Sequence, residues 1–288
     1  MFKGSMCAIV TPFKNNEIDY DCLAELVEFQ IQNGTKGIVP CGTTGESATM
    51  SHEEHHKVID TVIEKSDGRV PVIAGTGSNS TGEALELTRH AKKAGAQGAL
   101  LITPYYIKPT QEGLYRHYRQ IADEVNIPLI LYNVPGRTGV SLMPETIARL
   151  ASHPNIAAVK DATGSLDYAS MFRSLCDITI LSGNDSMNLP LLSIGAKGSI
   201  SVAANIIPDL ASEMVDAFLE GDADKAESIH KKIFPLVKAL FVETNPIPVK
   251  GALEMMGKIS GEIRMPLTPL SDQGAAVLRE EMEKLDLI

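Results

Sequence analysis

The sequence predicts an α/β protein, a (β/α)8 TIM barrel followed by a C-terminal helical extension. Short apolar runs alternate with longer amphipathic segments, and glycine, proline or small polar residues bound each run. The runs recur roughly every 20 to 35 residues, which leaves room for one crossover helix between parallel strands. Continuous apolar runs are also typical of strands that are covered on both faces.

Eight apolar runs are expected to form the strands of the barrel. In chain order they are residues 6–10, 37–40, 70–74, 98–102, 128–132, 156–160, 179–181 and 198–202. Capping boxes mark the start of two intervening helices, because Ser51 is followed by Glu54 and Ser80 is followed by Glu83. The local signals therefore agree with the β/α alternation.

Helix ends and the extent of the barrel follow from the same pattern. Gly34 and Gly95 come directly after two expected helices, where glycine is favoured. Eight β/α units fill residues 1–208, about the size of a compact barrel. Residues 209–288 contain no strand-like run and are expected to form three or four helices. No linker rich in glycine, serine or proline separates the two parts, so we expect the helical region to pack on the barrel.

Composition excludes several classes of function. A net charge of −10 and an isoelectric point near 5.2 argue against a nucleic-acid or anionic-membrane partner, because both need a basic face. The N-terminal apolar stretch is too short for a signal peptide, and no run of 18 apolar residues occurs. The cysteines are scattered and form no CxxC pair: Cys7, Cys22, Cys41 and Cys176. We expect a soluble, reduced, cytoplasmic protein.

Three unusual clusters follow predicted strands, at the end of a barrel where chemistry gathers. Residues 41–47 (CGTTGES) follow the second strand and combine glycines with two hydroxyls, a pattern that can hold an anion. Residues 132–139 (YNVPGRTG) follow the fifth strand. Lys160 closes the sixth. Each cluster alone has an ordinary alternative as a turn, a half-buried aromatic or a loop charge.

Lys160 is the most informative of these residues. It ends the apolar run 155–159, so burial is expected to shift its amine toward the neutral, nucleophilic form. The alternative is a strand-end lysine whose aliphatic stem lets the ammonium reach water. Tyr132 lies one repeat earlier, so it is expected on the neighbouring strand at the same level, where a phenol can relay protons.

In order and spacing, these residues resemble the 4-hydroxy-tetrahydrodipicolinate synthase family, which belongs to the superfamily of pyruvate-dependent class I aldolases and N-acetylneuraminate lyases. The resemblance covers essentially the whole chain. It includes the GTTGES loop, the YNVPGRTG segment and the strand-end lysine, together with residues 103–106 (TPYY) and 245–250 (NPIPVK). One conservative departure is Asp161, where many relatives carry glutamate.

The resemblance implies a lyase that uses a Schiff base. Lys160 would form it with pyruvate, and Tyr132 would donate and accept protons. Thr43 and Tyr106 would complete a proton relay, with Tyr106 reaching into the site of a neighbouring subunit. The residues leave open whether the ground-state pKa of Lys160 is strongly depressed or the relay removes its proton during attack.

Substrate binding and assembly are also implied by the resemblance. Thr44 and the backbone at Ile200 would hold pyruvate, and Arg137 would bind the carboxylate of L-aspartate 4-semialdehyde. The enzyme would be a homotetramer built from two dimers, and it would need no metal or organic cofactor. The product would be 4-hydroxy-tetrahydrodipicolinate, in the first committed step toward diaminopimelate and lysine.

A second polar cluster matches the allosteric lysine site of lysine-sensitive relatives, so L-lysine is an expected effector. Its members are Ser47, Ala48, His52, His55, Asn79, Glu83 and Tyr105. Glu83 also has a simpler role in the capping box that Ser80 begins. His52 and His55 also fit solvated positions in the first turn of a helix.

Four other functions remain to be weighed. Residues 52–56 (HEEHH) match the H-E-x-x-H pattern of zinc metalloproteases, but they stand at a helix start and lack an evident third ligand. Residues 75–80 (GTGSNS) resemble an incomplete dinucleotide-binding loop. A non-catalytic binding protein would be favoured if Lys160 reacted with no oxo-acid. Within the superfamily, the alternative is a lyase for a sugar acid, against which Arg137 argues.

Overall fold

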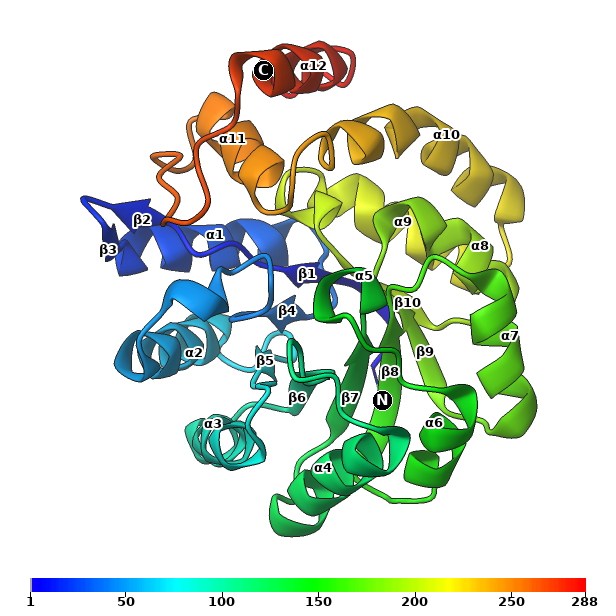
Figure 1. Cartoon of the computed structure of the whole chain (residues 1–288). Helices are drawn as coiled ribbons and strands as arrows, with labels where there is room; N and C mark the ends of the chain where they lie inside the picture. The colour runs from blue at the N-terminus through cyan, green and yellow to red at the C-terminus, as the bar shows by residue number, and fades with distance from the viewer. Residues whose placement is uncertain (1) are drawn as a thin grey trace.

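A computed structural model describes residues 2–288, and its parallel strands form a barrel (Figure 1). In chain order the strands are β1 (Gly4–Ala8), β4 (Ile38–Val39), β5 (Ile73–Gly75), β6 (Gly98–Ile102), β7 (Leu129–Asn133), β8 (Ile156–Asp161), β9 (Thr179–Ser182) and β10 (Gly198–Ser201). Each overlaps one predicted run, so all eight predicted strands are confirmed.

The sheet order is β4-β1-β10-β9-β8-β7-β6-β5, and the two end strands meet. A parallel bridge pairs Ile38 with Val72, and the backbone N–H of Gly75 donates to the carbonyl of Pro40 at 2.9 Å. These contacts close the sheet. The predicted (β/α)8 barrel is confirmed, and its carboxyl-terminal rim collects the loops that follow the strands.

Helices surround the barrel on its outer face (Figure 1). They are α1 (Tyr20–Gln32), α2 (His52–Ser66), α3 (Thr81–Ala94), α4 (Gln111–Glu124), α6 (Pro144–Ala151), α7 (Leu166–Leu175), α8 (Asn188–Ser193) and α9 (Pro208–Glu220). A further short helix, α5 (Pro135–Thr138), lies in the loop after β7 and carries Arg137.

The predicted helix caps are confirmed in part. The Ser51 hydroxyl accepts from the backbone of Glu54, and the Glu54 carboxylate accepts from the backbone of Ser51, so this capping box is complete. Ser80 caps α3 by accepting from the backbone of Glu83, but the expected return bond is absent. The Glu83 carboxylate instead accepts from the Ser78 hydroxyl. The predicted bond from the Ser80 backbone N–H to the Glu83 carboxylate was therefore wrong.

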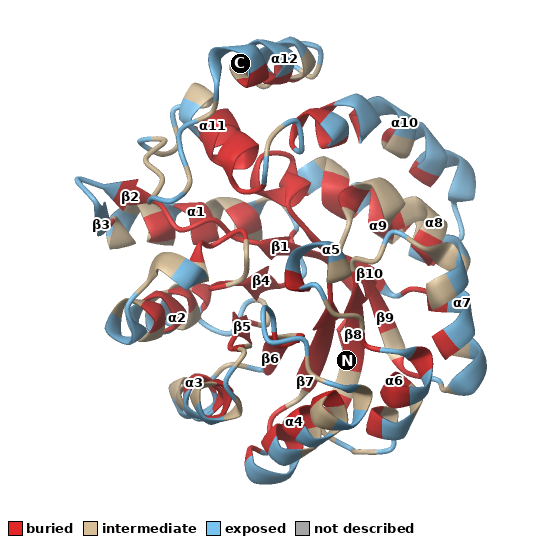
Figure 2. Ribbon diagram, in the orientation of Figure 1, coloured by how far each residue is buried: buried red, intermediate tan, exposed pale blue. Residues whose placement is uncertain are grey.

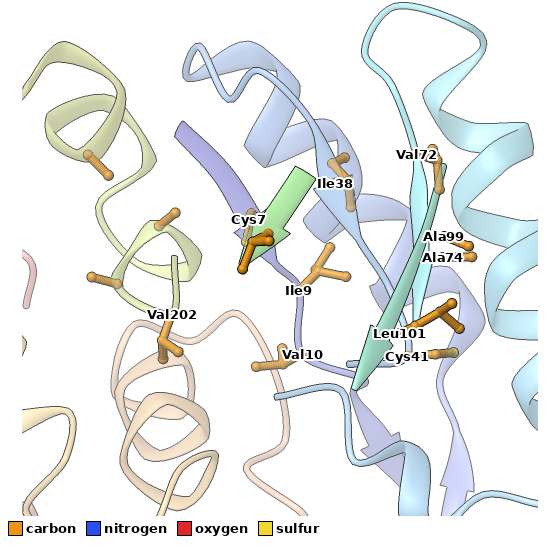
Figure 3. Packing of buried hydrophobic residues seen from close by; sticks show 14 of the residues in the cluster. Cys7, Ile9, Val10, Ile38, Cys41, Val72, Ala74, Ala99, Leu101 and Val202 are labelled. Carbon is orange, nitrogen blue, oxygen red and sulfur yellow. The ribbon is translucent and has the colours of Figure 1, made fainter. Parts of the chain in front are cut away.

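Two apolar layers hold the fold together. Alternate side chains such as Met6 and Ile200 fill the interior of the barrel. The intervening residues, among them Cys7 and Leu101, pack outward against the helices (Figure 3). Figure 2 shows the barrel strands buried along most of their length, whereas the exposed residues lie mostly on helices and loops. Phe2 belongs to the inner layer and packs against Gly98, where a β-carbon would lie 2.7 Å from its ring.

The C-terminal region is helical, as predicted. After α9 it contains α10 (Ala223–Ala239), α11 (Ile247–Met255) and α12 (Asp272–Glu283). Helix α9 packs against β1 and α10, so it occupies the place of the eighth barrel helix. The division of the chain at 208/209 stays a prediction, and the packing of α9 favours a boundary after this helix.

One hairpin was not expected from the sequence. Strands β2 (Phe13–Lys14) and β3 (Glu17–Ile18) pair in antiparallel fashion across a turn at Asn15 and Asn16, which both have positive φ. The Glu262 carboxylate accepts from both turn amides, at 2.8 and 2.9 Å. The C-terminal segment thus fixes the loop that follows β1.

A buried ion pair ties the C-terminal region to the loop after β4. The Nζ atom of Lys250 lies 2.6 Å from the Glu46 carboxylate, and each side chain is about 1% exposed. Nζ also donates to the Thr11 carbonyl at 3.0 Å, and the backbone N–H of Arg264 donates to Glu46 at 3.2 Å. Burial lowers the pKa of Lys250, whereas the Glu46 carboxylate opposes this shift. Sequence reasoning gave this pair no role.

We expect Lys250→Met to destabilise the protein strongly, because it leaves the Glu46 carboxylate buried without its partner. Breaking a buried pair in this way costs about 3–5 kcal/mol of unfolding free energy. Urea denaturation measures the change. Lys284→Met, which removes an exposed partner of Glu280 and Glu281 at the end of α12, is the control and should cost less than about 1 kcal/mol. Equal stability of the two variants would contradict this account, and adding Glu46→Gln to Lys250→Met should restore part of the loss.

Candidate active site

Tyr132 and Lys160 stand side by side on neighbouring strands. They are register partners in the parallel pairing of β7 with β8. The Lys160 Nζ atom lies 4.2 Å from the centre of the Tyr132 ring. Both residues are almost fully buried, 6% exposed for Lys160 and 7% for Tyr132. The prediction that they occupy the same level of the barrel is confirmed.

The surroundings of Lys160 shift its amine toward the neutral form. Burial lowers its pKa to about 8, Asp185 acts in the opposite direction, and Arg137 adds to the lowering. Gly183 on the neighbouring loop gives the side chain room, since a β-carbon there would lie 2.9 Å from Cγ and Cε of the lysine. The alternative of a strand-end lysine that reaches water is therefore wrong.

A cavity of about 320 Å³ opens over the amine. The three clusters identified in the sequence meet on its wall, which includes Thr43, Thr44, Tyr132, Arg137 and Lys160. Ile200 does not line it. Its side chain is buried inside the barrel, next to Met6 in the register of β10 with β1. The role of the Ile200 backbone stays a prediction.

Asn245 connects two of the predicted substrate-binding residues. Its side-chain amide donates to the Thr44 hydroxyl at 3.1 Å, and its backbone carbonyl accepts from the Arg137 guanidinium at 3.1 Å. Sequence reasoning placed Asn245 in the NPIPVK motif but assigned it no function. Asn245 lies 201 residues after Thr44 in the sequence, so the two residues come together only in the folded chain.

The surroundings of Tyr132 favour the protonated form of its phenol. Burial raises its pKa, while Arg137 and the Thr43 side chain act in the opposite direction. The backbone of the Thr43 loop is held in tight turns, since the N–H of Gly45 donates to the Gly42 carbonyl and that of Glu46 to Thr43. The loop therefore presents the Thr43 hydroxyl to the phenol on a fixed backbone.

Tyr106 lies away from the cavity in its own chain. It is 86% exposed, and its φ of +71° places its backbone in the left-handed region. Tyr105 is about half as exposed and turns toward a second cavity. The predicted entry of Tyr106 into a neighbouring subunit's site stays a prediction.

The second cavity, of about 480 Å³, adjoins the first and shares Thr43, Tyr132 and Arg137 with it. Most of the predicted lysine-binding residues line it: Ser47, Ala48, His52, His55, Glu83 and Tyr105. Asn79 is not among the lining residues, although its neighbour Ser78 is. The structure therefore gathers the predicted cluster at one place beside the catalytic cavity.

Polar side chains on the wall of the second cavity form hydrogen bonds with neighbouring groups. Glu83 accepts from the Ser78 hydroxyl and lies 2.7 Å from His52 Nε2, and these two contacts lower its pKa. His55 is buried rather than solvated. Burial lowers its pKa to about 4, and Nε2 donates to the Gly75 carbonyl at 2.9 Å. Only His52 fits the solvated alternative considered for the pair.

The metalloprotease pattern does not form a ligand set. His52 turns to Glu83, whereas the His56 ring stacks on His90 with 3.8 Å between ring centres. The two histidines required to bind one zinc ion thus have different partners. Within residues 2–288, no three His, Cys, Asp or Glu side chains are arranged to hold a metal ion.

The glycines of residues 75–80 have a structural explanation. A β-carbon on Gly75 would lie 2.2 Å from the carbonyl oxygen of Cys41, and one on Gly77 would lie 2.3 Å from the backbone nitrogen of Ile102. Backbones approach each other closely here, so glycine is required without any bound dinucleotide.

None of the helices formed by residues 2–288 is both long and apolar enough to cross a membrane.

Comparison with known proteins agrees with this site. The model of the Dihydrodipicolinate synthetase family matches residues 1–285. The 4-hydroxy-tetrahydrodipicolinate synthase of Geobacter sulfurreducens is 58% identical over 290 residues, which cover 100% of both chains. The chloride-inhibited dihydrodipicolinate synthase of Acinetobacter baumannii complexed with pyruvate has a TM-score of 0.98, with 49% identity and 100% coverage of both chains. The enzyme of Cyanidioschyzon merolae with lysine bound has a TM-score of 0.97, with 40% identity over 100% of this chain and 99% of the other.

The chain belongs to the Dihydrodipicolinate synthetase family, a class of lyases built on the (β/α)8 barrel. Its activity is that of a 4-hydroxy-tetrahydrodipicolinate synthase, which serves the biosynthesis of lysine and diaminopimelate. The resemblance inferred from the GTTGES loop, the YNVPGRTG segment and Lys160 is confirmed.

We expect Lys160→Met to be more stable than the native protein at pH 7. The folded-state pKa of about 8 lies below the reference value of 10.5, so folding must bury a charged amine at neutral pH. This costs about 3 kcal/mol, and the cost falls as pH rises from 8 toward 10.5, where the unfolded chain holds more protons.

Chemical denaturation of the two proteins at pH 7 and pH 10 measures this difference. The advantage of Lys160→Met should be about 1–3 kcal/mol at pH 7 and should shrink at pH 10. Lys93→Met, at an exposed position of α3, is the control and should show no such trend. A Lys160→Met protein that is less stable at both pH values would show that burial does not disfavour the charged amine.

Proposed function

We propose that Lys160 is the amine that forms the Schiff base with pyruvate. Its nitrogen attacks the keto carbon, and loss of water leaves an iminium that acts as an electron sink. The methyl group then loses a proton, and the resulting enamine carbon bonds to the aldehyde carbon of L-aspartate 4-semialdehyde. The observation that carries this assignment is a buried amine with a pKa of about 8, at the base of a cavity. About a tenth of such an amine is neutral at pH 7.

Ring closure completes the reaction and frees the enzyme. The amino group of the second substrate attacks the iminium carbon, and the bond to Lys160 breaks to give 4-hydroxy-tetrahydrodipicolinate. Tyr132 supplies and removes protons in these steps. Support comes from its raised pKa, its contact with the amine and the presence of Thr43 on the same cavity wall. Tyr106 of a neighbouring subunit extends this relay toward solvent.

Two contacts orient the substrates in our proposal. Thr44, whose hydroxyl is held by Asn245, binds the carboxylate of pyruvate together with the backbone at Ile200. Arg137 binds the carboxylate of L-aspartate 4-semialdehyde, because a guanidinium offers two parallel donors to such a group. The pyruvate complex of the Acinetobacter baumannii relative supports pyruvate as the first substrate. No metal or organic cofactor enters these steps.

We expect borohydride treatment in the presence of pyruvate to add one reduced pyruvate per chain, located on Lys160. The hydride traps the iminium as a stable secondary amine, and intact-mass measurement with peptide mapping detects it. Lys250 is the internal control, because it is equally buried but paired with Glu46. A label on Lys250, or no label at all, would refute the proposed mechanism.

The proposed assembly is a homotetramer formed by two dimers in the cytoplasm. Tyr106 stands between two further exposed apolar side chains, Tyr105 and Ile107, and exposed apolar side chains that gather in this way are typical of interfaces. The free cysteines of the described chain support a reducing compartment. The dimer would be the smallest active unit, since each site would contain Tyr106 of the neighbouring subunit.

We expect Tyr106→Phe to lose most activity while assembling normally, because the phenol is removed but the ring remains. Mixing it with a Lys160→Ala protein should restore some activity, since a hybrid dimer contains one site with both groups. Turnover after subunit exchange measures this rescue, and mass spectrometry verifies the exchange. Verified hybrids without activity would mean that Tyr106 does not act across subunits.

We also propose that L-lysine binds in the second cavity and inhibits the enzyme. The Glu83 carboxylate offers a partner for an ammonium group, and the lysine-bound Cyanidioschyzon merolae relative supports this ligand. The cavity shares Thr43 and Tyr132 with the catalytic cavity, so an occupant would contact the proton relay. Asn79, which does not line the cavity, would act only after a rearrangement.

We expect Glu83→Ala to abolish inhibition by L-lysine while leaving most of the turnover. The variant removes the only carboxylate besides Glu46 on the wall of the second cavity, and Glu46 is neutralised by Lys250. Glu86→Ala, one turn further along α3 at an exposed position, is the matched control and should remain sensitive. Native enzyme that is unaffected by millimolar lysine, or equal sensitivity of both variants, would refute the site.

A further inference from the structure

The wall of the catalytic cavity carries positive charge only. Its lining residues include Lys160, Arg137 and Lys238, and no aspartate or glutamate is among them. The chain as a whole has the opposite character, with 36 acidic and 26 basic residues. The proposed mechanism uses Lys160 and Arg137, but it gives Lys238 no role.

Lys238 comes from outside the barrel. It lies in the last turn of α10, the helix that follows the eighth barrel helix, and Val237 and Phe241 from the same segment also line the cavity. A cation in the last turn of a helix is favoured by the helix dipole. That effect explains a lysine near the helix end, but it does not explain why this side chain stands on the cavity wall.

The charge of Lys238 is not neutralised nearby. Within residues 2–288 it forms no ion pair shorter than 4.0 Å, and it is exposed to solvent. Two acidic groups near α10 have other partners: Asp185, in a short helical turn that contacts α10, and Glu243, which follows Lys238 by five residues. Asp185 accepts from the backbone N–H groups of Val202 and Ala203, and Glu243 accepts from Ser271.

We propose that Lys238 captures anionic substrates at the entrance of the catalytic cavity, with pyruvate as the first of them. Clefts lined by charge of one sign concentrate the field and raise the local concentration of ions of the opposite sign. Here the field must overcome the repulsion that a protein of net charge −10 exerts on a carboxylate. Lys238 and Arg137 are exposed, whereas Lys160 is buried, so the two outer charges stand between solvent and the reacting amine. The inference rests on the proposed reaction of Lys160 with pyruvate.

The effect of Lys238 is on substrate entry and not on the chemical steps. At about 10 Å in water two unit charges interact only weakly, and a charge reversal doubles the change. We therefore expect Lys238→Glu to lower kcat/KM for pyruvate about threefold to tenfold at low ionic strength. The loss should shrink near 0.5 M salt because the Debye length then falls to about 4 Å. The kcat at saturating substrate should not change.

A series of variants at one position separates charge from shape. Lys238→Arg should behave like the native enzyme, Lys238→Met should be intermediate, and Lys238→Glu should be the slowest. Lys232→Glu changes the net charge equally on the same helix, but residue 232 does not line the cavity, so it is the matched control. Ionic strength is varied with two different salts, because the Acinetobacter baumannii relative is inhibited by chloride.

The second measurement is labelling of Lys160 by pyruvate and borohydride in each variant. If Lys160 is labelled at saturating pyruvate in every variant, and only Lys238→Met and Lys238→Glu lose kcat/KM in a salt-dependent manner, the capture role is supported. Labelling in all variants with equal kcat/KM for Lys238→Glu and Lys232→Glu overturns it, although the Schiff-base mechanism stands. A loss that salt does not reduce, or a fall in kcat, also overturns it. Failure to label Lys160 even in the native enzyme refutes the mechanism itself.

Discussion

The register between β7 and β8 is the constraint on which the catalytic site depends. In parallel strands, successive side chains alternate between the interior and the exterior of the barrel, so a shift of one residue would turn Lys160 toward the helices. The observed pairing of Tyr132 with Lys160 places a phenol and an amine together inside the rim. Burial then lowers the pKa of the amine to about 8 and raises that of the phenol. Burial thus favours the neutral form of both groups, an amine that can attack a carbonyl and a phenol that keeps a proton to donate.

The C-terminal region supports this arrangement from outside the barrel. Asn245 bonds to Thr44 and Arg137, and the buried pair of Lys250 with Glu46 anchors the loop that carries Thr43. These contacts explain why a chain whose barrel ends near residue 220 continues through three more helices. The helices complete the wall of the cavity and hold the loop, so removing them would affect binding as well as stability.

Much of the fold could be predicted because the barrel strands are continuous apolar runs bounded by turn residues. The hairpin of β2 and β3 was not predicted because each strand has only two residues, too few to show an alternation of apolar and polar residues. Asn15 and Asn16 nevertheless form the kind of two-residue turn that joins such strands. The site residues could be named because they stand at the carboxyl ends of the second, fifth and sixth predicted strands and match the motifs of the family. The pair of Lys250 with Glu46 could not, since 204 residues separate them and no local pattern relates the two. The return bond expected from Glu83 was lost to Ser78, which lies five residues earlier and outside the four-residue capping pattern.

The central claim is that burial in the barrel, and not the proton relay alone, makes Lys160 a nucleophile at neutral pH. NMR titration of the protein with ¹³C-labelled lysine tests it most directly, with the Lys160 signal assigned by its loss in Lys160→Met. The account predicts that this lysine titrates with a pKa of about 8, well below the reference value of 10.5. A titration near 10.5 in the folded enzyme would contradict it and would leave the relay through Tyr132 and Thr43 as the means of removing the proton.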